Sequence, residues 1–229
     1  MTKFFTPFVR QVVLLALLTS GGCLVVNWFH HTEIYRERLY TKLLHGDADQ
    51  KLVAASALAQ YCGQEQLFRA LRSPDESVRD LARRGIEFIW FNAAGPAAYQ
   101  LNLAAYEAAE QQDLPGALEM LDQLVECYPR YAEGWNRRAC VLWQMGQYEK
   151  SLTDCERALA LNPLHYGAWQ GIGVCHLHLG NVTAACRALR KALQLAPHDK
   201  DTRDSLERCE QLLRDDPEPE KRQRLLDMI

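Results

Sequence analysis

The residues of this chain that could carry chemistry are its cysteines and histidines, and one pair has a spacing that suits a metal ion. Cys175 and His178 are three residues apart, so a helix would place both on one face, as two zinc ligands require. The sequence holds no second pair spaced to complete a tetrahedral site. A cysteine buried in a helical core explains Cys175 better. We therefore expect no metal and no cofactor.

Two other groups of candidate residues are also predicted to be structural. His30 and His31 adjoin an apolar segment, which is typical of a membrane-interface dipeptide. Arg187, Arg190 and Lys191 would form a solvated strip on one helix, not a phosphate site. The sequence has no glycine-rich phosphate loop, nucleophile elbow or paired-carboxylate motif, so we predict that the protein is not an enzyme.

Composition favours a globular chain and argues against nucleic-acid binding. Of 229 residues, 48% are hydrophobic and 24% are charged, which is ordinary for a folded protein. The formal net charge is -3 and the pI is about 6.2. A nucleic-acid-binding domain would instead show a basic surface.

The first 31 residues have the features of a membrane anchor or an export signal. Lys3 and Arg10 precede the apolar run 12–18, and small residues follow up to Cys23. This arrangement resembles bacterial lipoprotein signals, which implies that Cys23 is a candidate for lipidation. Residues 12–29 would equally suit one membrane-spanning helix, and a cleaved secretory signal is the third possibility.

The cysteine count bears on the compartment. The chain has eight cysteines and no Cys-x-x-Cys pair, so without Cys23 an odd number is left, which suits a reducing environment. The odd number of cysteines argues against export, although buried thiols can stay unpaired outside the cytosol. On balance we expect a membrane-associated protein of the bacterial cell envelope more than of the cytoplasm.

Residues 32–92 show the periodicity of short amphipathic helices. One helix is expected over 34–45, ended by Gly46, and a second begins with Asp49 as its N-cap. A short helix, an acidic turn and a longer helix come next, and the longer helix carries Val78 and Arg79 near its start. Helix, acidic turn and a helix bearing Val-Arg resemble HEAT-type repeats. The alternative is a set of unrelated helical hairpins that cap the array after residue 97.

The next part of the chain repeats itself after 34 residues. Trp135 and Trp169 begin the two clear copies, and each copy has a glycine near its middle and a proline near its end. A period of this length is the signature of a helix-turn-helix solenoid. The two clear units cover residues 132–165 and 166–199, a weaker one covers 98–131, a capping helix 200–214 and a mobile acidic tail 215–229.

These repeats resemble the tetratricopeptide repeat family in the residues that occupy fixed positions. The middle unit matches at Trp135, Ala139, Gly146, Tyr148, Ala158 and Pro163, and the last unit at Trp169, Gly173, Gly180, Ala185, Ala192 and Pro197. The resemblance implies an all-α protein, a right-handed solenoid of helix-turn-helix repeats. Within each unit the small residues would let the two helices pack closely.

The resemblance also implies where a partner binds, because in this family the first helices of successive units line a concave groove. The groove positions carry mainly aromatic and amide side chains: Tyr99, Asn102, Tyr106, Asn136, Trp143, Gln144, Gln170 and His178. The positions at which relatives hold acidic chaperone tails with lysine or arginine are Asn102, Gly167 and Gly171 here. We therefore expect an uncharged groove that does not bind such tails.

Two functions from different classes are consistent with this organisation. The first is a membrane-tethered scaffold that binds a protein or peptide segment in the concave groove. The alternative is a rigid structural subunit of a membrane or envelope complex, which would use its convex face or the HEAT-like segment. The sequence does not identify the partner.

Overall fold

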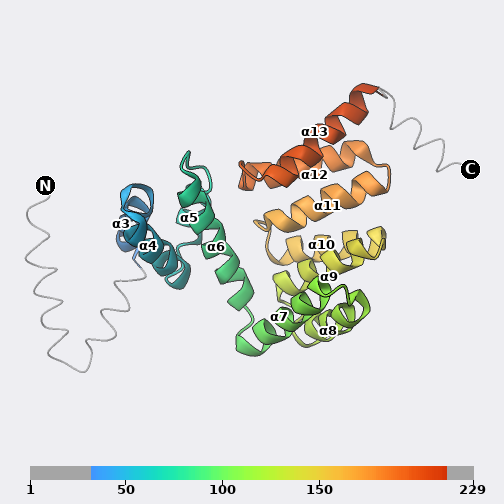
Figure 1. The fold of residues 1–229 in the computed structure, drawn as a ribbon, viewed down its shortest axis with the longest axis horizontal. Helices are drawn as coiled ribbons and strands as arrows, with labels where there is room; N and C mark the ends of the chain where they lie inside the picture. The colour runs from blue at the N-terminus through green and yellow to red at the C-terminus, as the bar shows by residue number, and fades with distance from the viewer. Residues whose placement is uncertain (1–31, 216–229) are drawn as a thin grey trace, which may run out of the picture. The chain divides into compact units, whose positions relative to one another are not determined.

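The structure of the chain is a computed structural model, and it describes residues 32–215. Within these residues the chain forms helices and no strand, as Figure 1 shows. The helices are α3 (Glu33–His45), α4 (Ala48–Gln60), α5 (Gln64–Ala70), α6 (Glu76–Asn92), α7 (Pro96–Glu110), α8 (Leu114–Cys127), α9 (Ala132–Gln144), α10 (Tyr148–Leu161), α11 (Tyr166–His178), α12 (Val182–Leu195) and α13 (Lys200–Asp215). The prediction of an all-α solenoid is thereby confirmed.

Several predictions fall on parts of the chain outside this range. Cys23, His30 and His31 precede the described residues, and all of the predicted tail except Asp215 lies beyond them. Among residues 32–215, no helix combines the length and the apolar character that crossing a membrane requires.

The chain divides into two compact units between Ile86 and Glu87, a point within α6. In the first unit, α3 packs on α4 and α5, and α4 also packs on α5. Leucines from three helices are buried at its centre: Leu43, Leu58 and Leu67.

The start of α4 differs from the prediction. The N-cap is Asp47, not Asp49, because Asp47 has the extended backbone of a cap and its Oδ1 accepts a hydrogen bond of 2.8 Å from the Gln50 amide. Asp49 lies in the first turn instead, where a carboxylate also favours the positive end of the helix dipole. Asp47 and Asp49 are both residues that favour an N-cap, so the sequence alone does not decide between them. The backbone conformation of the structure does.

The Val-Arg pair at the start of α6 has two separate roles. Val78 is fully buried, whereas the Arg79 guanidinium donates hydrogen bonds to the carbonyl oxygens of Ser73 (3.0 Å) and Pro74 (2.7 Å). The arginine thus holds the turn that precedes its own helix. The HEAT-like assignment itself stays a prediction.

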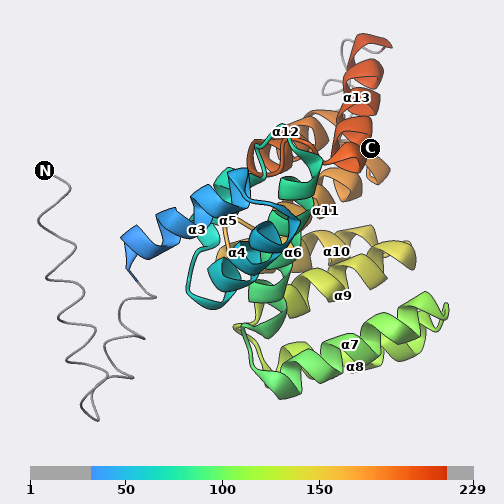
Figure 2. The same ribbon diagram turned by 60° about the vertical axis from the view of Figure 1, so that its left-hand side comes forward.

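The second unit contains the repeats, stacked in order from α7 to α13 (Figures 1 and 2). Helices α9 and α11 begin 34 residues apart, at Ala132 and Tyr166, and so do α10 and α12, at Tyr148 and Val182. In the turns between paired helices, Gly146 and Gly180 have φ angles of 75° and 77°, which side chains rarely tolerate. Helix α13 packs on α12 and covers the end of the stack.

Small residues bring the two helices of a unit into contact. A Cβ atom added to Gly173 of α11 would lie 2.5 Å from Cγ of Leu189 on α12. In the preceding unit the Ser151 hydroxyl donates a 2.7 Å hydrogen bond to the Ala139 carbonyl across the same kind of interface. The steric pattern of the sequence therefore corresponds to real close approaches.

Candidate partner-binding face

The first helices of the three units form a continuous row, because α9 contacts both α7 and α11. We call the side of the second unit that α7, α9 and α11 line the first-helix face. All eight predicted groove residues lie on these three helices. The two ends of this face differ in chemistry.

An aromatic cluster of three rings lies at the C-terminal ends of α9 and α11, with its third ring, Tyr148, from the first residue of α10. The Trp143 ring meets the His178 ring edge-on, with centroids 5.7 Å apart, and the Tyr148 ring stacks on His178 at 4.4 Å. Trp143 is 37% exposed and His178 is exposed. Gln144 is exposed beside them in the sequence. The structure thus brings together two predicted groove residues from adjacent repeats, and it adds Tyr148.

The N-terminal ends of α9 and α11 carry a buried polar network instead. Glu133 Oε1 accepts a 2.7 Å hydrogen bond from Arg137 Nε, and Glu133 Oε2 lies 2.8 Å from His165 Nε2. His165 Nδ1 accepts the backbone amide of Ala168 at 3.1 Å, so the proton of a neutral imidazole is on Nε2, which donates to Glu133. We call these three side chains the Glu133 network.

The charge of Glu133 is set by two opposing effects. Burial alone would raise the pKa of this carboxyl, but the hydrogen bond and charge interaction with His165 and the Arg137 guanidinium outweigh it and lower the pKa. Glu133 is therefore a buried carboxylate at neutral pH. A buried charge of this kind needs both partners to be held in place.

The last turn of α6 lies directly on the Glu133 network. The Trp90 ring stacks on the His165 ring, with centroids 4.3 Å apart and planes 19° apart, and it also contacts the Tyr166 ring at 5.2 Å. The Arg137 guanidinium lies 4.7 Å from the centroid of the Phe91 ring. Residues that precede the repeats therefore cover this end of the first-helix face.

The other predicted groove residues differ in accessibility. Asn102 is buried, and its Nδ2 donates a 3.2 Å hydrogen bond to Tyr131 Oη. Asn136 is also buried, Tyr99 and Gln170 are half-buried, and Tyr106 is exposed. The two asparagines are therefore part of the packed wall, and the accessible groups are mainly aromatic.

Sequence reasoning did not assign Trp90, Phe91, Arg137 or His165 to this face. A signal existed for Arg137, because Glu133 and Arg137 have the i, i+4 spacing of a helical ion pair. The contact of Trp90 with His165 joins residues 75 positions apart, one of which is outside the repeat register. No local pattern could have indicated it.

The pair Cys175 and His178 is not arranged as a metal site. Cys175 is buried, its thiol donates to Ser151 Oγ at 3.2 Å, and burial raises its pKa. His178 takes part in the aromatic cluster instead. In residues 32–215 no group of three or more histidine, cysteine or acidic side chains is placed to hold a metal ion.

Comparison with known proteins agrees with this architecture. Residues 136–200 match the family described as tetratricopeptide repeat. A TPR repeat-containing protein of Rhizobium etli is 35% identical over 138 residues, which are 59% of this chain and 67% of the relative. The human DnaJ homolog subfamily C member 7 is 29% identical over 85 residues, or 37% of this chain, and the chain spans only 17% of it.

Solved structures share the fold at low sequence identity. The first TPR of Spaghetti (RPAP3), bound to the HSP90 peptide SRMEEVD, has a TM-score of 0.50 and 20% identity over 51% of this chain and 92% of that one. The Sgt2 TPR domain from Aspergillus fumigatus has the same TM-score and identity over 52% of this chain and 80% of that one. The stacked helix pairs and these similarities define a helical-repeat protein. The chain belongs to the tetratricopeptide repeat family.

Proposed function

We propose that this protein is a scaffold that binds a peptide or protein segment on its first-helix face and has no catalytic role. The observation that carries the proposal is the aromatic cluster, in which α9 and α11 present Trp143 and His178 next to each other at the surface. Partly exposed tryptophans are typical anchors of protein interfaces. The repeat fold supports the proposal because its members commonly use this face for binding.

The chemistry of the open end suits a partner without strong charge. Trp143 and His178 offer ring faces and edges, and Gln144 offers an amide that can pair with a partner's backbone. Arg137, a cation on this face, is already engaged with Glu133. We infer a partner that buries an apolar or aromatic side chain at the cluster.

The experiment is selection of binding peptides from a random library with the purified full chain, followed by affinity measurements on variants. Trp143→Ala should weaken a selected peptide by about tenfold or more, as loss of a hot-spot residue does. Leu212→Ala is the matched control, because Leu212 is similarly exposed, at 42%, but lies on α13. Equal affinity of both variants would refute the proposal.

We also propose that the chain is tethered to a membrane through residues 1–31, by lipidated Cys23 or by one spanning helix. The apolar run after Lys3 and Arg10 supports this proposal. Growth with a clickable palmitate analogue should label the wild-type chain but not Cys23→Ser. Unlabelled protein that still fractionates with membranes would favour the helix, and recovery in the soluble fraction would contradict the tether.

A specific observation favours the alternative role of a structural subunit that binds through its first unit. Ile34 of α3 and Val53 of α4 are 65% and 66% exposed, and Leu52 is exposed beside Val53. Residues of α3 and α4, including Tyr35 and Val53, line a mostly apolar pocket of about 430 Å³. Under this alternative, Val53→Asp should abolish assembly with a partner while Trp143→Ala leaves it intact.

A further inference from the structure

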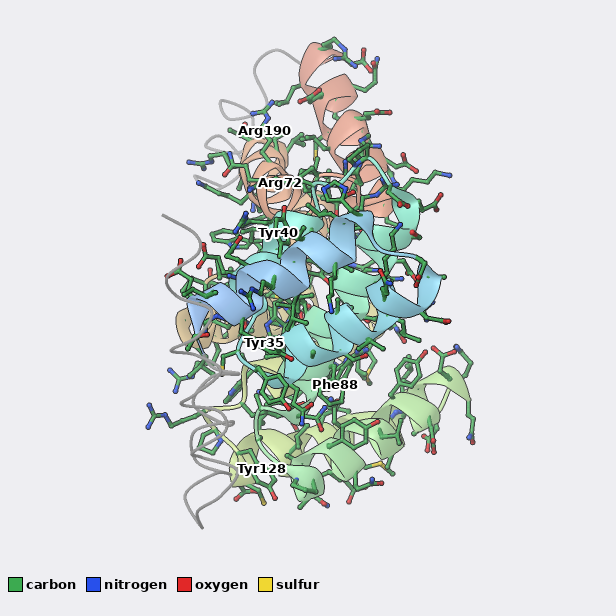
Figure 3. All side chains as sticks on the ribbon, turned by 90° about the vertical axis from the view of Figure 1, so that its left-hand side faces the viewer. Tyr35, Tyr40, Arg72, Phe88, Tyr128 and Arg190 are labelled. Atoms are coloured by element: carbon green, nitrogen blue, oxygen red, sulfur yellow. The ribbon has the colours of Figure 1, made fainter. Side chains whose placement is uncertain are left out.

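The last turn of α6 contacts the first-helix face with one side and solvent with the other. Trp90 is 7% exposed, whereas Phe88, two residues earlier on the same helix and labelled in Figure 3, is 55% exposed. Two large aromatic residues on one helical turn thus have opposite environments. Trp90 is therefore buried by its contact with the first-helix face, and not because every aromatic residue of this turn is buried.

The surface that receives this turn has the contacts of a ligand site. His165 and Tyr166 meet the indole ring, Arg137 lies over the phenyl ring of Phe91, and the Tyr131 hydroxyl donates a 3.0 Å hydrogen bond to the Phe91 carbonyl. That carbonyl belongs to the last turn of a helix, where backbone acceptors have no intrahelical donor. The surface therefore contacts this turn in three ways: by ring stacking, by a cation–π contact and by a hydrogen bond to a backbone carbonyl.

Two further features show that the site is built into the repeats. The Glu133 carboxylate holds Arg137 and His165 in position through contacts of 2.7 and 2.8 Å. Asn102 orients Tyr131 through Nδ2, while its buried Oδ1 has no hydrogen-bond partner within the described part of the chain. The wall of the site thus has rigid supports and one unused acceptor.

We propose that Tyr131, Arg137, His165 and Tyr166 form a subsite for a tryptophan-bearing segment, and that residues 87–92 are its resident intramolecular ligand. This inference rests on the proposed function of the first-helix face and deepens it. A partner that uses this end of the face carries a comparable aromatic pair at a helix end and must displace Trp90 and Phe91. The open aromatic cluster is the end at which such a partner begins to bind.

The chain connection gives the resident segment its advantage over a partner. Only residues 93–95 separate α6 from α7, so the segment is held at an effective concentration on the order of millimolar or higher. Substitutions that remove the Trp90 and Phe91 rings should therefore raise the affinity of the protein for a separate peptide with the sequence of this segment.

The test uses a fluorescein-labelled peptide of residues 84–94 and the full chain, with binding followed by fluorescence anisotropy. The double variant Trp90→Ala, Phe91→Ala should bind the peptide at least about tenfold more tightly than the wild type, because the internal competitor is gone. Phe88→Ala is the matched control and should behave as the wild type. A peptide with alanine in place of its tryptophan should not bind any of the proteins.

Site-side variants locate the binding. Adding Tyr166→Ala to the double variant should abolish peptide binding, whereas adding Trp143→Ala should leave it unchanged. Circular dichroism verifies that each protein is helical. If the double variant loses helicity, the measurement uses the single variant Trp90→Leu instead, because leucine keeps apolar volume at this position but lacks the stacked indole ring.

Equal peptide affinity of the wild type and the helical vacated variant, or no binding to that variant, would overturn the proposal. Failure of this peptide together with successful library peptides that need Trp143 would reject the subsite alone. Failure of both measurements would reject the proposed function.

Discussion

Glu133 is the residue on which the chemistry of the first-helix face depends most. Its carboxylate is buried and charged, and it positions both the guanidinium of Arg137 and the imidazole of His165. Removing one member of such a network leaves a buried charge without compensation, which costs more than the network contributes as a whole. Glu133 therefore links the stability of the repeats to the positions of Arg137 and His165 in the proposed subsite.

We predict that Glu133 makes stability depend on acid pH. Its folded-state pKa is below the ordinary value of 4.5, so its stabilisation is fully present above that value and is lost as the pH falls through the folded-state pKa. Glu133→Gln should lower the free energy of unfolding by about 3 kcal/mol at pH 7 and remove this part of the pH dependence. Urea unfolding between pH 7 and pH 3 measures both effects.

The exposed Glu126→Gln is the control for this measurement, because Glu126 has the same chemistry on the surface of α8. It should match the wild type at every pH. An acid profile of Glu133→Gln identical to that of the wild type would contradict the assignment.

Arg138 provides a second prediction at the scale of a residue. From α9 it reaches both oxygens of the buried Asp154 on α10, at 2.7 and 2.8 Å, and also Asp122 on α8. Arg138→Ala strands the Asp154 carboxylate and should cost about 3 kcal/mol. Arg190→Ala, which breaks the exposed pair with Glu210, should cost less than about 0.5 kcal/mol. Chemical denaturation distinguishes the two, and equal losses would contradict the role of Arg138 as a link between helices.

At the scale of the helices, the 34-residue pattern was sufficient to predict the paired helices of the second unit and their close packing. Periodicity succeeds here because each repeat buries the same positions against its neighbour. It could not choose between Asp47 and Asp49 as a helix cap, since both residue types satisfy the same signal. The pattern also could not predict the burial of Trp90, because this burial depends on a contact with His165, which is far away in the sequence.

The close approach of α11 and α12 leads to a prediction about glycine. Gly173→Ala should destabilise the protein by about 1–3 kcal/mol, because the new methyl group would overlap Leu189. Gly167→Ala is the matched control in the same helix: its Cβ would lie 3.4 Å from the nearest His165 atom, and alanine favours helix. Thermal unfolding should show a lower midpoint for Gly173→Ala alone.

At the scale of the whole molecule, the chain combines a repeat unit, for which we propose binding, with a first unit that has its own surface features. Tyr40 and Arg72, labelled in Figure 3, line a pocket of about 600 Å³ in the first unit. Charged side chains line this pocket, whereas aromatic rings form the cluster at Trp143. The family and the fold could be predicted from sequence. The buried state of Asn102 and the covering of His165 could not, because both depend on side chains brought together by tertiary packing.

Binding specificity should also depend on the whole first-helix face. The predicted groove positions Asn102, Gly167 and Gly171 carry no cation, and Arg137 is paired with Glu133. We predict that the peptide SRMEEVD, which is bound in the RPAP3 structure, does not bind this chain measurably in isothermal titration calorimetry. Micromolar binding would contradict the expectation that this face has no free cation to hold an acidic tail.

The most direct test of the central claim is hydrogen–deuterium exchange of the full chain with and without a library-selected peptide. If the first-helix face binds the peptide, protection should increase in α9 and α11 and around Trp143, Tyr148 and His178, and should stay unchanged in α12 and the first unit. Protection confined to residues 32–86, or to α10 and α12, would contradict binding at the first-helix face.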